Sequence, residues 1–153
     1  LLNRFLEEFR GTVFRQTMFA EFELIVHGMA ERGEPLTAQT LCGVYHRLLT
    51  EYFGPAVEID PYMDWEWARI PHFYNAFYVY KYATGFSAAA AIAHDILAGG
   101  DVGRYLEFLK AGGNDSPADI LQRAGVDMTT PAPVEKALRE FADVSLELER
   151  LLS

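Results

Sequence analysis

The feature that most constrains the fold is the helical spacing of apolar side chains at the start of the chain. From Leu2 to about residue 32 these side chains recur every three or four positions, and they include Phe5, Phe9, Val13, Phe14, Met18, Phe22, Ile25 and Met29. Two stripes overlap, which predicts one long helix that is buried on more than one side. At the usual rise, such a helix would be roughly 45 Å long, which indicates that it braces a large body.

The rest of the chain continues this pattern, and no segment alternates as a strand would. Gly33 and Pro35 end the first helix, and Thr37 caps the next one. Further helices are predicted over residues 38–53, 75–97, 101–110, 116–123 and 130–151. We therefore expect an all-α fold, a multi-helix array with two long helices and a long C-terminal helix, in a single helical domain over residues 1–153.

One stretch interrupts the helical pattern. Residues 54–71 contain Pro55, Pro61 and Pro71 among several acidic side chains. Proline removes a backbone donor and disfavours helix at the residue before it, so this stretch is predicted to be irregular. Trp65 and Trp67 are expected to anchor it to the core.

Composition narrows the class of protein. The 153 residues carry a net charge of −9 and no basic stripe, so nucleic-acid binding is not expected. Cys42 is the only cysteine, which rules out an internal disulfide and suits a cytoplasmic location. No apolar run approaches the ~20 residues of a membrane span, and no signal-peptide pattern is present. Because the helical pattern is already under way at Leu2, the chain is expected to be a piece of something longer.

The most unusual stretch is residues 69–86, called the aromatic segment below. It contains four tyrosines, three phenylalanines and His72, directly after Pro71. If a helix begins at that proline, His72, Ala76, Tyr80 and Ala83 share one face, and Tyr74, Tyr78 and Tyr82 form another stripe. On spacing alone, the segment is either an aromatic core helix with hydroxyls at its rim or one side of a binding cleft. In the cleft, His72 and Tyr80 would donate hydrogen bonds to a developing oxyanion.

Metal-binding and nucleophilic motifs are absent from the sequence. Glu23 and His27 are one helical turn apart, but no third ligand is evident, so they are expected to form a solvated surface pair. There is no H-E-x-x-H, no pair of cysteines, no phosphate-binding glycine loop and no G-x-S-x-G. Taken alone, the chain holds no complete catalytic constellation.

Five stretches together resemble the C-terminal part of oligoendopeptidase F, a zinc metallopeptidase family related to thimet oligopeptidase. They are residues 12–23 (TVFRQTMFAEFE), 67–74 (WARIPHFY), 77–88 (FYVYKYATGFSA), 106–113 (LEFLKAGG) and 124–129 (AGVDMT). The stretches follow one another in the family's order and span most of the chain. The resemblance implies an all-helical zincin-type peptidase whose deep cleft admits short peptides.

The same resemblance implies how the active site is divided. In the family, zinc is bound by H-E-x-x-H on one helix and a glutamate on a following helix, and both lie upstream of the part seen here. This chain would bind no metal itself and would supply the opposite wall of the cleft, so it is expected to be inactive alone. By motif match, His72 takes the role of the family histidine, and Tyr80 is the first choice for the tyrosine that stabilises the transition state. Tyr78, Tyr74 and Arg69 are expected to bind the substrate.

The sequence is compatible with two hypotheses of function. In the first, the chain is part of a peptidase that acts on short peptides and has no nucleic-acid or membrane partner. The isolated chain is then expected to self-associate through its exposed cleft surface. In the second, it is a non-catalytic helical module that binds a peptide or a protein. An in-frame H-E-x-x-H in the upstream coding sequence would favour the first hypothesis, and a start codon near Leu1 would favour the second.

Overall fold

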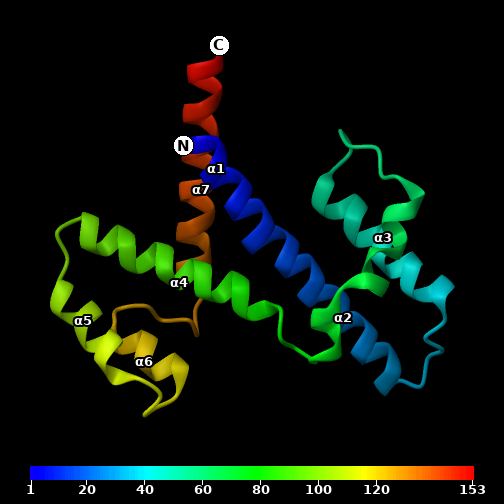
Figure 1. Ribbon diagram of the computed structural model, residues 1–153, viewed down its shortest axis with the longest axis horizontal. Coiled ribbons are helices and arrows are strands. Elements are labelled where there is room, and N and C mark those ends of the chain that lie inside the picture. Colours follow the sequence, from blue (N-terminus) through cyan, green and yellow to red (C-terminus); the bar gives the residue numbers. More distant parts are fainter. The chain divides into compact units, whose positions relative to one another are not determined.

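A computed structural model describes all residues from 1 to 153, and every regular element in it is helical (Figure 1). The all-α prediction is therefore confirmed. The elements, in chain order, are α1 (Leu2–Phe9), the π-helix η1 (Arg10–Phe14), α2 (Arg15–Glu31), α3 (Ala38–Phe53), the 3₁₀-helices η2 (Pro61–Arg69) and η3 (Pro71–Tyr74), α4 (Tyr80–Leu97), α5 (Val102–Ala111), α6 (Pro117–Arg123) and α7 (Ala132–Leu152). No helix combines the length and the apolar character that crossing a membrane requires.

The chain divides into two compact units. Unit 1 comprises Leu1–Val13 and Thr84–Ser153, and unit 2 comprises Phe14–Ala83. The expectation of a single domain stays a prediction, and each unit is described by itself.

In unit 1, α1 packs against α7, and α5 packs against α6 (Figure 1). Phe9 is fully buried and lies between Phe86 of α4 and Phe141 of α7, with ring centroids 5.2 and 4.8 Å away. A second cluster is built on the small-residue face of α4, and its buried members are Ala88, Ala91, Ile92, Ala124 and Val126. These small side chains allow close approach of the neighbouring segments.

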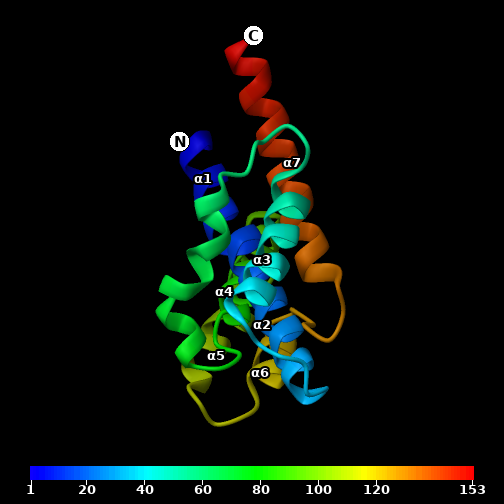
Figure 2. The same cartoon turned by 90° about the vertical axis from the view of Figure 1, so that its right-hand side faces the viewer.

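In unit 2, α2 packs along α3 (Figure 2). Met18, Phe19 and Phe22 of α2 meet residues of α3 at helical spacing, namely Tyr45, Leu48 and Leu49. Fully burying an aliphatic or aromatic side chain stabilises a fold by about 1.5–3 kcal/mol, so this face supplies much of the unit's stability. Thr37 caps α3 as expected, because its hydroxyl accepts a hydrogen bond from the Thr40 amide.

The proline-rich stretch is more regular than expected. Residues 61–69 form a nine-residue 3₁₀-helix, capped by the side chain of Asp60. Trp67 packs on the core and its indole N–H lies 3.4 Å from the sulfur of Cys42, so it anchors the stretch. The same prediction is wrong for Trp65, which is 54% exposed.

The helix expected from residue 75 begins later, at Tyr80. A short 3₁₀-helix, η3, ends at Tyr74, and Phe77 then has a positive φ of 56°. A helix cannot run through a residue in that conformation, so η3 and α4 are separate elements. The predicted shared helical face of His72, Ala76 and Tyr80 is therefore not formed.

Candidate functional site

The turn between η3 and α4 determines which aromatic side chains meet. The Tyr78 amide donates to the carbonyl of Asn75 at 3.2 Å, which closes the turn around Phe77. Val79, the next residue, is fully buried in the core of unit 2. With Val79 fixed in the core, Tyr78 is turned back toward His72.

His72, Tyr78 and Tyr82 form a compact group, called the His–Tyr cluster below. The His72 ring stacks on Tyr78 with centroids 5.7 Å apart and meets the edge of Tyr82 at 5.9 Å. The Tyr82 hydroxyl lies 3.4 Å from Nε2 of His72 and donates to the Tyr78 hydroxyl at 3.3 Å. These distances are longer than usual for hydrogen bonds from a hydroxyl, so both contacts are weak.

Two electrostatic contacts involve the tyrosines of the His–Tyr cluster. The hydrogen bond with Tyr78, followed by desolvation, raises the pKa of the Tyr82 hydroxyl above its ordinary value. The ammonium of Lys81 lies 5.3 Å from the centroid of the Tyr78 ring, within the range of a cation–π contact. The His–Tyr cluster can therefore present hydroxyl protons to a ligand without first changing its charge.

The other predicted site residues lie outside the His–Tyr cluster. Tyr80 is 49% exposed and Tyr74 is 90% exposed, so both present aromatic surface to solvent. Arg69 is held by Glu66, whose Oε1 lies 2.6 Å from its guanidinium. The structure thus brings His72 together with Tyr78 and Tyr82, and Tyr80 is not a member of this group.

Glu66 gathers donors from three elements. Besides Arg69, its carboxylate accepts from the guanidinium of Arg15 and from the hydroxyl of Tyr45, the latter at 2.8 Å. Burial is the main cause that raises the pKa of Tyr45 far above its usual value, and the hydrogen bond to Glu66 is the second. Arg69 therefore has a structural partner in unit 2.

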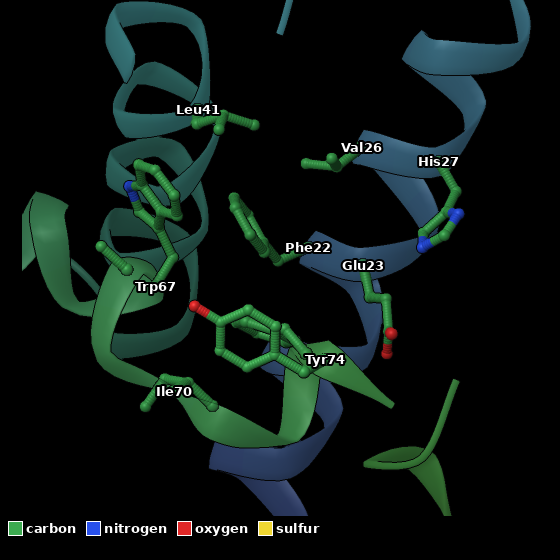
Figure 3. A pocket seen from close by; sticks show the side chains of 10 residues that line it. Phe22, Glu23, Val26, His27, Leu41, Trp67, Ile70 and Tyr74 are labelled. Carbon is green, nitrogen blue, oxygen red and sulfur yellow. The ribbon is translucent and has the colours of Figure 1, made fainter. Parts of the chain in front are cut away.

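A pocket of about 240 Å³ opens beside the aromatic segment. Apolar side chains of α2, α3, η2 and η3 line most of it, and Figure 3 shows Phe22, Val26, Leu41, Trp67 and Ile70 around it. Glu23 and His27 extend from the same side of α2 (Figure 3). The aromatic segment thus contributes residues both to this pocket and to the His–Tyr cluster.

The expectation of a solvated Glu23–His27 pair is wrong. Glu23 is only 5% exposed, and its carboxylate accepts a hydrogen bond of 2.6 Å from the amide of Phe77. The His27 ring lies 4.6 Å from the Phe77 ring. Both side chains therefore hold the turn of the aromatic segment. Phe19 and Val26, four positions before and three positions after Glu23, are apolar, which was the available sign that Glu23 faces the interior.

The residues of this chain do not fit a zinc site. No group of three or more His, Cys, Asp or Glu side chains converges on one point. A catalytic zinc ion takes three protein ligands, so the zinc that the resemblance implies would need ligands from outside these residues.

The sequence pattern of peptidase family M3 matches residues 1–140. The chain belongs to peptidase family M3. Among curated proteins, "Oligopeptidase PepF" of Bacillus subtilis (strain 168) is 54% identical over 99% of this chain. "Oligoendopeptidase F, chromosomal" of Lactococcus lactis subsp. cremoris is 46% identical, again over 99% of the chain. The crystal structure of oligoendopeptidase-F from Enterococcus faecium is also similar, with a TM-score of 0.96 and 50% identity over 99% of the chain.

These relatives are much longer than this chain. The match covers 23% of the Bacillus protein, 26% of the Lactococcus protein and 29% of the Enterococcus structure. The chain thus spans about a quarter of the length of the relatives it matches.

Proposed function

We propose that this chain is the C-terminal part of a zinc-dependent oligoendopeptidase that hydrolyses short peptides. Membership of peptidase family M3 supports peptide-bond hydrolysis, and the names of the relatives support oligopeptides as substrates. Within that enzyme, the aromatic segment forms one wall of the substrate cleft. The zinc ligands and the group that activates water come from residues outside this chain, and a cytoplasmic location remains a prediction.

Family membership carries the peptidase assignment, and the His–Tyr cluster supports the role given to the aromatic segment. Positioned neutral donors stabilise a developing oxyanion without any change in their own charge. In this proposal His72 and Tyr80 donate to the oxyanion, and Tyr78 and Tyr82 hold the His72 ring in place. Tyr80 lies between the two cluster tyrosines in sequence and is half exposed, which suits contact with a bound peptide. Tyr78, Tyr74 and Arg69 contact the substrate.

The test is a set of tyrosine variants in the full-length enzyme, assayed with a quenched fluorescent peptide. Removing one oxyanion donor costs about 10²–10³ in kcat, so Tyr80→Phe should lower kcat by this factor and leave KM nearly unchanged. Tyr78→Phe and Tyr82→Phe keep their rings and should lose less. An unchanged kcat in Tyr80→Phe, beside a large loss in one of the other two, would transfer the role to that tyrosine.

The isolated chain gives a second test. Purified with added zinc, it should show no peptide turnover, because it contains no three-ligand metal site. Turnover at the rate of an intact peptidase would contradict the proposed division of the active site. Tight binding of peptides by the isolated chain, with no H-E-x-x-H encoded upstream, would instead favour the non-catalytic binding module.

The isolated chain should also self-associate. The cleft surface around Tyr74 and Tyr80 exposes aromatic area that the rest of the enzyme would otherwise border, and such patches promote association. Light scattering at rising concentration would detect this, and a strictly monomeric species at high concentration would argue against it.

A further inference from the structure

Glu23 is a buried carboxylate with one hydrogen-bond partner. It is 5% exposed, and Oε1 accepts from the Phe77 amide at 2.6 Å. Burying a polar group is costly unless a hydrogen bond replaces the contact with water that it loses. The contact therefore serves both residues: it gives a buried oxygen of Glu23 a hydrogen-bond partner and occupies the amide of Phe77.

Phe77 needs such a partner. It is the chain's only non-glycine residue with a positive φ, at 56°. This conformation is strained for a residue with a β-carbon, so it persists only where the surroundings enforce it. Two side chains of α2, one helical turn apart, do so. Glu23 holds the backbone N–H, and the His27 ring lies 4.6 Å from the Phe77 ring.

The conformation of Phe77 also decides where Tyr78 lies. Phe77 is held by α2 on one side of Tyr78, and Val79 is fully buried in the core on the other. Between these fixed points Tyr78 stacks on His72 with centroids 5.7 Å apart and accepts the hydrogen bond from Tyr82. If Phe77 relaxed to a negative φ, the path of the chain would change directly before Tyr78, and the stacking on His72 would be lost.

We propose that Glu23 is a positioning residue, which holds Phe77 in its left-handed conformation and thereby assembles the His–Tyr cluster. The catalytic part of this inference rests on the proposed function, but the structural part does not. A misplacement of about 1 Å at a reacting centre lowers the rate by up to about 10²-fold, so loss of the Glu23 contact should lower kcat.

Two variants of nearly equal volume separate the hydrogen bond from packing. Glu23→Gln keeps an oxygen that can accept from the Phe77 amide, whereas Glu23→Met fills the same space without a good acceptor. The matched control is Glu31→Met, at an exposed glutamate of the same helix. All three are made in the full-length enzyme.

The first measurement is hydrogen exchange followed by mass spectrometry, which does not depend on activity. Glu23→Met should raise the exchange of the peptide that contains Phe77 at least tenfold and leave the α3 peptides protected. Glu23→Gln and Glu31→Met should behave like wild type. Unchanged exchange in Glu23→Met would overturn the inference whatever the function of the enzyme.

The second measurement is steady-state kinetics. Glu23→Met should lower kcat about 10–100-fold with KM changed less than threefold, and Glu23→Gln should recover most of the loss. Equal losses in both variants would overturn the role of the acceptor. If Glu23→Met exchanges faster but keeps the wild-type kcat, Glu23 still holds Phe77 in place, but it has no effect on catalysis. That result would also count against the proposed role of the His–Tyr cluster.

A third variant covers the case in which Glu23→Met does not fold. Glycine adopts positive φ at no steric cost, so Glu23→Met/Phe77→Gly should recover the fold. If this double variant does not fold although the single variant Glu23→Gln folds normally, the inference is also overturned.

Discussion

Tyr45→Phe tests whether the hydrogen bonds around Glu66 stabilise unit 2. Tyr45 is fully buried, and its hydroxyl donates to Oε2 of Glu66 at 2.8 Å. The substitution removes this one bond and keeps the ring, so the edge contact with Phe22, at 5.3 Å between centroids, is retained. Any change in stability then reports the hydrogen bond rather than packing.

The expected size follows from the partners that remain. A hydrogen bond to a charged group contributes about 1.5–3 kcal/mol to stability. Arg15 and Arg69 still bind Glu66 after the substitution, so the carboxylate is not left unpaired. We therefore expect a loss of about 1.5–2 kcal/mol in the free energy of unfolding, at the low end of that range. For a chain of this size, this corresponds to a fall in Tm of roughly 3–8 °C.

The assay is urea unfolding followed by far-ultraviolet circular dichroism. The control is Tyr52→Phe, which removes a hydrogen bond of 2.9 Å to Glu21 from a tyrosine that is only partly buried. Because water can replace that bond, the control should lose less than ~1 kcal/mol. If Tyr45→Phe is no more destabilising than Tyr52→Phe, the hydrogen bond between Tyr45 and Glu66 does not stabilise unit 2 by the expected amount.

Two further predictions concern the same unit. Burial and the bond to Glu66 raise the pKa of Tyr45 above its ordinary value of 10.0. Above about pH 10 the unfolded state therefore loses a proton that the folded state keeps, and stability should fall by up to about 1.4 kcal/mol per pH unit. Urea midpoints above pH 10 should fall less steeply in Tyr45→Phe, and equal slopes would contradict this origin. Thr37→Ala removes the cap of α3 and should cost about 1 kcal/mol in thermal unfolding, whereas Thr37→Ser should cost little.

Local signals in the sequence predicted most of the helices. The predicted range 38–53 agrees with α3, Ala38–Phe53, because the Thr37 cap and the Gly54 end are both local features. The long first helix was also predicted over nearly its full range, except that Arg10–Phe14 is π-helical. A π-helical turn inside a helix leaves no signature in apolar spacing that distinguishes it from α-helix.

The candidate site was predicted less well because its geometry depends on distant contacts. Phe77 is neither glycine nor asparagine, so nothing in the sequence marks it for a positive φ. Its conformation is held by Glu23, and without that contact the segment has the apolar spacing of a helix. The sequence therefore identified His72 and the tyrosines as a group but paired His72 with Tyr80, whereas the structure pairs it with Tyr78 and Tyr82.

The Glu23–Phe77 contact has a consequence for the order of folding. It joins residues 54 positions apart, so forming it requires a long loop to close. Closing that loop costs more chain entropy than forming the local turns of α2 and α3. A strained residue at the end of such a loop gains its partner only after α2 has formed. We therefore expect the Phe77 amide to become protected later than those of α3 in pulsed hydrogen exchange during refolding, which would make the turn beside His72 one of the last parts of unit 2 to form.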